Sequence, residues 1–414
     1  MGIPTSSPIE PSCRTENLDV RFRAVGTALA ESFGALLAAI PGGPHRPNRL
    51  AELLEVNRAV TSRLLKATAQ RDPFEVLHLL PGPEPLRKIT LRLAALEFDA
   101  NLLEAADAAV AEFDQLISEE AGTRPALNAL IAPHLPGARE KLELASRYSI
   151  FRGISQLKGV QGELWMGTAI VTPSPDKADR LDLTWLNGAV AIQRLRPGVS
   201  VRFSYRRDDP PATQEQEADD IPGLGLASLE HFCINPPAKL EARRDGETIH
   251  YTLPGDVLGP RDQVDMFVVD HHPASMRRYA DPEAFARDRA RSAFFVEPAI
   301  PVANLLFDVI LHEDAFPGTE PELFFYDTGY NGIANVNDAA RDLDRVEIVA
   351  PIEMLGTDFA RYSAAELASY GPMLQHLGQR FGWDSRRFRG YRLRLQYPVH
   401  GWQVSMAFRQ PQAP

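Results

Sequence analysis

Residues 49–66 read RLAELLEVNRAVTSRLLK, and this stretch decides how the N-terminal part of the chain is interpreted. Apolar residues recur at helical spacing in two short runs, 48–54 and 58–70. The small Ala51 allows two helices to cross closely, and four aliphatic side chains can fill the angle between them: Leu50, Leu54, Val56 and Leu64. Asn57 can cap the second helix through its side-chain oxygen. The pattern predicts two short helices joined by a tight turn.

This stretch resembles the helix-turn-helix of bacterial transcription regulators, over residues 48–67 only. The resemblance implies that the second helix lies in the major groove of double-stranded DNA and that its outward face contacts bases and phosphates. We expect the DNA contacts to come from Arg46, Arg49, Asn57, Arg58, Ala59, Ser62, Arg63 and Lys66. Two positions depart from the pattern, because Glu55 stands where glycine is usual and Thr61 where a β-branched aliphatic residue is usual.

The charge distribution fits a local anion-binding face on an acidic body. The whole chain carries a net charge of −11. The segment 21–88 holds ten Lys or Arg and six Asp or Glu, which gives it +4 and leaves −15 for the rest. Such an asymmetry is compatible with a segment that contacts phosphates, and ordinary variation in surface charge explains it equally well.

Residues 18–158 are predicted to be helical. We expect a flexible leader at 1–17, a helix-turn-helix domain at 18–90 and a helical linker at 91–158. Helical periodicity covers 18–40, 74–80, 126–130 and 139–155, and a long helix without any breaker is expected over 91–117. These long helices are the candidate for a homodimer interface, because two-fold symmetry doubles the base contacts of a small reading helix.

From Glu163 onward the periodicity is close to two, which is typical of strands. The expected strands are 164–171, 180–185, 189–194, 199–205, 248–253, 264–269, 304–312, 323–326, 346–350, 391–397 and 403–408. Helices are expected at 282–291, 338–343 and 364–381, and an exposed loop at 210–225. The predicted fold class is therefore α+β and multidomain: an N-terminal helix-turn-helix domain, long linking helices, and a β-rich α+β region over 159–414.

Few residues in this region have the spacing of a catalytic or metal site. Three groups contain metal-ligating types: Asp270-His271-His272, His312-Glu313-Asp314, and His231 with Cys233. None has the His-x-x-x-His or Cys-x-x-Cys spacing of common metal sites, so we expect no metal and no cofactor. No nucleophile elbow or phosphate-binding glycine loop occurs. The basic run 386–392 is predicted to be a solvated face.

A ligand pocket is expected where one strand ends. The stretch 324–332 reads FFYDTGYNG and places aromatic, acidic and amide groups beside glycines. The candidate ligand-binding residues are Tyr326, Asp327, Tyr330 and Asn331. The same residues can equally form a structural turn in which Asp and Asn side chains bond to their own backbone.

These observations predict a DNA-binding transcription regulator, not an enzyme, that senses a small-molecule effector through its C-terminal region. Two alternatives stay open: an enzyme whose site lies in the β-rich half, and an adaptor that binds proteins through its helices. An enzyme predicts Asp, Glu and His groups converging in a cleft of the second half. The polar start and the absence of a long apolar stretch predict a cytoplasmic protein with no membrane partner.

Overall fold

The computed structural model describes residues 13–206, 216–217, 224–225, 227–237, 240–254 and 259–414 of the chain. Residues 1–12 of the flexible leader expected at 1–17 lie outside the described residues, as does most of the loop expected at 210–225. Residues 13–17 belong to a helix instead. The chain divides into two compact units, Met1–Leu142 and Glu143–Pro414, which we call the helical unit and the β-rich unit. The expected α+β multidomain class is confirmed at this level.

The helical unit is built around the first helix. Its helices are α1 (Cys13–Ala39), α2 (Pro47–Leu54), α3 (Arg58–Thr68), α4 (Pro73–Leu79), α5 (Pro83–Ala95), α6 (Ala100–Leu116), the π-helical turn η1 (Ile117–Ala121), α7 (Arg124–Ile131) and the 3-10 turn η2 (Ala132–His134). The apolar face of α1, with Phe22, Leu29 and Phe33, is buried in the core of this unit. Gly26 makes this packing possible, because a Cβ there would collide with the Pro73 backbone carbonyl.

The turn between α2 and α3 uses a residue other than glycine. Glu55 adopts the left-handed conformation at φ 52°, which costs a residue with a side chain about 1–2 kcal/mol. Asn57 caps α3 as expected, accepting from the Ala59 N–H at 2.8 Å. The hydroxyl of the buried Thr61 donates to Pro47 and Arg58 carbonyls at 2.8 and 3.0 Å. The two departures from the helix-turn-helix pattern are therefore accommodated by backbone strain and by hydrogen bonds.

The prediction of one long helix over 91–117 is wrong. The chain forms α5 and α6 instead, and the break falls at Glu97, where φ is 56°. Asp99 then starts α6 by accepting from the Asn101 N–H at 2.9 Å.

One helix, Leu18–Ala39, is long and apolar enough to cross a membrane by length and composition. Helices buried in protein cores meet the same criterion. Leu18–Ala39 is the larger part of α1, and its apolar face is buried in the core of the helical unit.

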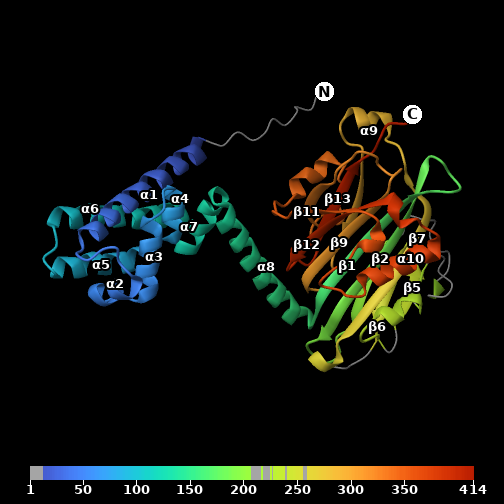
Figure 1. The fold of residues 1–414 in the computed structure, drawn as a ribbon, viewed down its shortest axis with the longest axis horizontal. Coiled ribbons are helices and arrows are strands. Elements are labelled where there is room, and N and C mark those ends of the chain that lie inside the picture. The colour runs from blue at the N-terminus through green and yellow to red at the C-terminus, as the bar shows by residue number, and fades with distance from the viewer. Residues whose placement is uncertain (1–12, 207–215, 218–223, 226, 238–239, 255–258) are drawn as a thin grey trace. The chain divides into compact units, whose positions relative to one another are not determined.

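The β-rich unit contains a six-stranded sheet in the order β11-β12-β9-β1-β2-β7 (Figure 1). Its strands are β1 (Val160–Pro173), β2 (Arg180–Arg194), β7 (Val264–Arg277), β9 (Val302–His312), β11 (Ile352–Thr357) and β12 (Phe388–Gln396). β1 and β9 are parallel, and the other pairs are antiparallel. The last part of α8 (Pro136–Lys158) leads into β1 and belongs to this unit from Glu143 onward.

Two smaller sheets share the core with one face of the six-stranded sheet. They run β10-β13-β8 and β3-β6-β5-β4, and their strands are β3 (Val201–Arg206), β4 (Gln216–Glu217), β5 (Glu241–Asp245), β6 (Thr248–Leu253), β8 (Arg291–Val296), β10 (Glu322–Asp327) and β13 (Trp402–Arg409). Helix α10 (Tyr370–Phe381) and the turn η4 (Ala227–Phe232) cover the opposite face. The alternation along β1 explains this arrangement, since Trp165 and Ala169 join the first core and Met166 and Ile170 the second.

Several sequence predictions for this unit need correction. The helix expected at 282–291 is shorter than predicted: α9 spans Pro282–Ala286, and strand β8 begins at Arg291. The segment expected as a strand at 346–350 forms none: the Val346 N–H donates to the Phe325 carbonyl of β10 at 2.9 Å, and the strand that follows is β11. The separate strands expected at 180–185 and 189–194 form the single strand β2, which bulges at Ala191, where φ is 53°.

An ion pair is buried where α10 lies on the sheet. Arg392 of β12 faces Asp308 of β9 in register, with guanidinium–carboxylate distances of 2.8 and 2.7 Å. Both side chains are at most 1% exposed. The Tyr370 hydroxyl donates to the same carboxylate, and Thr168 lies 3.2 Å from that hydroxyl. The network is fully enclosed, so it belongs to the core and not to a ligand site.

Candidate active site

The residues expected to face DNA are spread over α2 and α3. Arg46 and Arg49 are exposed at the start of α2, and Arg58, Ala59 and Lys66 are exposed on α3, with Ser62 half-buried. Arg63 makes hydrogen bonds to another helix of the helical unit. Its guanidinium donates to the Leu79 and Leu80 carbonyls at 3.0 and 2.8 Å, where it closes the end of α4 (Pro73–Leu79). Arg63 therefore stabilises the packing of two helices.

The residues expected to line a ligand pocket lie at the end of β10 and in the compact turn after it. Tyr326 is fully buried, whereas Tyr330 is 96% exposed. Asp327 accepts from the Gly329 N–H at 2.9 Å, which is the structural alternative foreseen for this residue. The Asn331 amide donates to Asp344.

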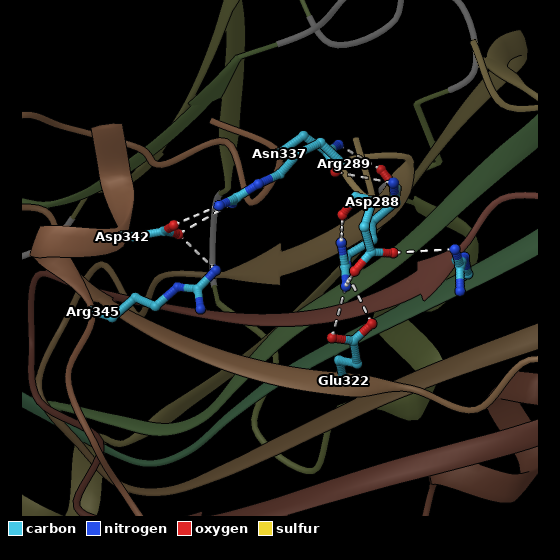
Figure 2. Close-up of polar contacts among 8 residues, drawn as sticks. Asp288, Arg289, Glu322, Asn337, Asp342 and Arg345 are labelled. Carbon is cyan, nitrogen blue, oxygen red and sulfur yellow. Dashed lines mark hydrogen bonds and ion pairs between the residues drawn. The ribbon is translucent and has the colours of Figure 1, made fainter. Parts of the chain in front are cut away.

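An ion-pair network lies against this turn. Figure 2 shows Arg289 and Arg345 converging on the Asp342 carboxylate, at 2.7 and 2.8 Å. The Arg345 guanidinium also lies 6.0 Å from the centroid of the Tyr326 ring. The ring is thus covered by protein groups.

A cleft of the β-rich unit is lined by several charged residues. It has a volume of about 350 Å³ and lies where β9 ends and β12 begins. Its lining comprises Glu313, Pro317, Gly318, Thr319, Glu320, Met354, Thr357, Arg386, Arg387, Phe388, Arg389 and Tyr391. We call it the His312 cleft, because His312 ends β9 directly before the first lining residue. The cleft shares Glu313 with the cluster described next.

Three potential metal ligands follow one another at this strand end. Ligand atoms of His312, Glu313 and Asp314 lie within 4.8 Å of one another. One imidazole and two carboxylates form a donor set that suits Zn²⁺, Mn²⁺ or Fe²⁺. The sequence singled out these residues but gave them little weight, because consecutive positions lack the usual spacing. The turn after β9 brings the three side chains to one side.

Arginines from β12 and the turn before it complete the cluster. Arg387 donates to Glu313 at 2.6 Å and lies 3.4 Å from Asp314. Arg389 donates to the Ala315 and Phe316 carbonyls at 3.0 and 2.6 Å, which fixes the turn that carries the ligands. The basic run predicted to be a solvated face is therefore partly engaged with this turn.

The surroundings of His312 favour the neutral form of its imidazole. Burial lowers its pKa, and the positive charges of Arg387 and Arg278 lower it further, against the opposing carboxylates. Its Nδ1 accepts from the Asp314 N–H at 3.2 Å, and the ring packs edge-on against Phe388 at 5.2 Å. A neutral, oriented imidazole is the form that ligates metals.

No family model matches the chain, and no curated protein matches it. The structures that match include two of an M1 zinc metallopeptidase from Deinococcus radiodurans, one of them a mutant bound to a Tyr-Ser-Ala substrate. Each match has 9% sequence identity and a TM-score of 0.23, and covers 60% of this chain and 42% of that chain. A likeness this low carries no argument about the chemistry of this chain. The sequence itself lacks the His-Glu-x-x-His of zinc peptidases, since Phe316 follows His312-Glu313 at the position of the second histidine.

The expectation of a DNA-binding, ligand-sensing regulator that is not an enzyme is corrected. Neither a family model nor a curated relative supports a regulator. The convergence of His, Glu and Asp groups beside a cleft of the second half is the feature expected for the enzyme alternative.

Proposed function

We propose that the β-rich unit is a hydrolytic enzyme that uses a divalent cation and acts on a small anionic substrate in the His312 cleft. The observation that carries this proposal is the convergence of one imidazole and two carboxylates, within 4.8 Å, at the end of β9, where Glu313 also lines a cleft of about 350 Å³ together with Arg386, Arg387 and Arg389. When bound, a divalent cation supplies Lewis-acid polarisation and lowers the pKa of water.

The residues of the cleft divide into three roles. His312, Glu313 and Asp314 would hold the cation. Arg386, whose side chain is 78% exposed and paired only with Asp384 in the described part of the chain, would attract the negative group of the substrate. Arg389 positions the turn through its carbonyl contacts and does not touch the substrate in this proposal.

Arg387 limits cation binding in the resting cleft. Its guanidinium pairs with the carboxylates of both Glu313 and Asp314, so a cation that binds them must displace the guanidinium. This competition makes a sharp prediction, because removal of Arg387 should free the carboxylates and tighten cation binding, whereas removal of His312 should weaken it.

The experiment is calorimetric titration of the full chain with Zn²⁺ and with Mn²⁺. We expect wild type to bind one cation, His312→Ala to bind it at least about tenfold more weakly, and Arg387→Ala to bind it more tightly. His250→Ala is the control, because His250 lies on β6 outside the cluster. A wild type that binds neither cation, or one whose affinity ignores His312, would overturn the proposal.

Catalysis is tested with p-nitrophenyl phosphate, and the neutral p-nitrophenyl acetate serves as the comparison. Cation-dependent hydrolysis of the phosphate ester that is lost in His312→Ala and weakened in Arg386→Ala supports the assignment. Equal hydrolysis of both esters, unaffected by chelator, contradicts it.

We further infer that α2 and α3 form a helix-turn-helix corner whose role is packing within the helical unit. Three contacts support this interpretation: the Thr61 hydroxyl bonded to Pro47, the Arg63 guanidinium bonded to the end of α4, and the Asn57 cap. Each of them satisfies groups inside the unit.

A further inference from the structure

A second cavity of the β-rich unit lies beside the last turns of α8, away from the His312 cleft. Its volume is about 410 Å³, within the range of small-molecule sites. One face of α8 supplies five of its lining residues, at positions 148, 151, 152, 155 and 156, which have the spacing of a single helix face. β1 and β2 supply most of the rest.

The helix is anchored where it lines this cavity. Arg147 donates to the Gln396 carbonyl at 2.7 Å, and Arg196 donates to the Leu157 carbonyl at 2.9 Å. Lys158 contacts His400 at 2.9 Å and the Ala299 carbonyl at 3.3 Å. These contacts on both sides of the lining residues make the helix a fixed wall.

One wall is aromatic. The Tyr397 ring lies 5.0 Å from Tyr148 and 5.4 Å from Phe151, with interplanar angles of 60° and 36°. The rings form one broad apolar surface and not a slot between two parallel rings. A ligand that rests on it needs one apolar face, and its other sides meet polar groups.

The other walls are rich in amides. They carry four glutamines: Gln156, Gln161, Gln193 and Gln263. Gln161 donates to Gln193 at 3.4 Å, across the β1–β2 ladder. In the described part of the chain, the side chains of Gln156 and Gln263 make no hydrogen bond. Each amide both donates and accepts, as hydroxyl groups do.

A buried hydroxyl points to a ligand in its own right. Ser155 is 2% exposed, lines the cavity, and its Oγ has no hydrogen-bond partner. A buried polar group without a hydrogen-bond partner lowers the stability of the fold. Such a group in a native structure therefore calls for an explanation, and a bound ligand would supply the missing partner.

The backbone of the cavity is strained at two lining positions. Ala191 and Tyr397 adopt left-handed conformations at φ 53° and 49°. Such strain in residues other than glycine concentrates at binding sites, because the surrounding structure must hold it.

The charges of the cavity nearly cancel. Arg152 and Glu163 are its only charged lining residues, and Glu163 already accepts from Asn304 at 3.0 Å. The cavity therefore favours a neutral ligand. This contrasts with the His312 cleft, where arginines gather.

We propose that this cavity binds a neutral carbohydrate of one or two sugar rings. The apolar face of a pyranose fits the aromatic wall, and its hydroxyls match groups that donate and accept together. A nucleobase has two π faces and would require a second aromatic wall, and a peptide backbone is usually paired by main-chain groups. The proposal is independent of the cation-dependent hydrolysis proposed for the His312 cleft.

The test is saturation-transfer NMR on the full chain with glucose, galactose, N-acetylglucosamine and cellobiose as probes, and with adenosine and glycyl-glutamine as the competing chemistries. We expect saturation transfer to at least one sugar, and weaker transfer to adenosine and to the dipeptide. Transfer to no sugar, or stronger transfer to adenosine or the dipeptide, overturns the proposal.

Ser155→Ala distinguishes a ligand contact from a structural role. We expect the Tm to stay the same or rise, because the unpartnered hydroxyl is removed, while sugar affinity falls roughly 3- to 10-fold. Ser149→Ala is the matched control on the same helix, since the Ser149 hydroxyl donates to the Ala145 carbonyl and does not line the cavity. Unchanged sugar affinity in Ser155→Ala would contradict the assignment.

Tyr148→Ala provides a second variant that leaves the core intact, because Tyr148 is 41% exposed. Removal of its ring should weaken sugar binding by a similar factor. Sugar binding that ignores both Tyr148 and Ser155 would place the sugar elsewhere and overturn the proposal.

Discussion

The buried pair of Asp308 and Arg392 allows a quantitative test of how the six-stranded sheet is stabilised. Arg392→Met removes the guanidinium but keeps an apolar stem of similar length. Asp308, which is fully buried, then loses its two strongest donors and retains the Tyr370 hydroxyl. Breaking a buried pair from one side typically costs about 3–5 kcal/mol.

The surroundings of Asp308 favour the same direction of effect. Burial raises the pKa of the Asp308 carboxyl, and the hydrogen bonds and charge of Arg392 oppose that rise. Without Arg392 the pKa of this carboxyl is expected to rise further, which favours its protonation in the folded state. The loss of stability in Arg392→Met should therefore become smaller as the pH falls from 7 toward 4, because the uncompensated charge disappears.

Tryptophan fluorescence reports this unit alone, because the chain has four tryptophans and all lie beyond Glu143: Trp165, Trp185, Trp383 and Trp402. With a urea m-value of about 3 kcal/mol/M, the expected loss lowers the midpoint by about 1–1.7 M. The double variant with Asp308→Asn should lose less than the sum of the two single variants, since each single change already breaks the pair.

The control is Arg394→Met on the same strand. Arg394 is 41% exposed and pairs with Glu353 and Glu366, so its removal should cost at most about 1 kcal/mol. If Arg392→Met and Arg394→Met shift the urea midpoint equally, burial does not set the energy of these pairs and the reasoning is refuted.

Three further outcomes follow from local geometry. Gly26→Ala should destabilise the helical unit by about 1–3 kcal/mol, because the added Cβ meets the backbone of α4. Gly34→Ala on the same helix adds a Cβ that meets nothing and should stabilise the unit by about 0.5–1 kcal/mol. Hydrogen exchange of α1 measures both changes. Glu55→Gly should raise the stability of the same unit by about 1 kcal/mol through relief of left-handed strain, and an unchanged Tm would contradict this. Burial, aided by a neighbouring lysine, lowers the pKa of His400, so stability should fall as the pH drops below about 6.5, and His400→Gln should flatten that dependence in fluorescence-monitored unfolding.

Local patterns along the chain predicted most of the elements. The segments around β1, β6, β7 and β9 became strands; β6 alternates buried and half-buried residues, whereas β1 and β9 are buried on both faces. The helix cap at Asn57 formed as its side chain suggested. The failures are places where tertiary structure decided the outcome. Residues 96–98 contain no helix breaker, yet the chain turns there so that α6 can pack against α1 and α5.

The two sites depend on pairings that no local pattern contains. The β9–β12 ladder places His312 opposite Phe388, which brings Arg387 and Arg389 to the turn after β9. From sequence these arginines read as a solvated run, because the partners they meet at the turn after β9 lie 74 residues away in the chain. Residues from one face of α8 and from two strands likewise acquire a shared cavity only after folding.

The same comparison explains why a cationic helix was a weak guide to function. Spacing on α3 places Arg58 and Lys66 at the surface, as expected for exposed positions of any amphipathic helix. Arg63 has the same spacing and the same charge, yet its donors serve two carbonyls at the end of α4. Helical periodicity predicts which face is polar, and only the partners of each donor decide whether that face is available for recognition or already used for packing.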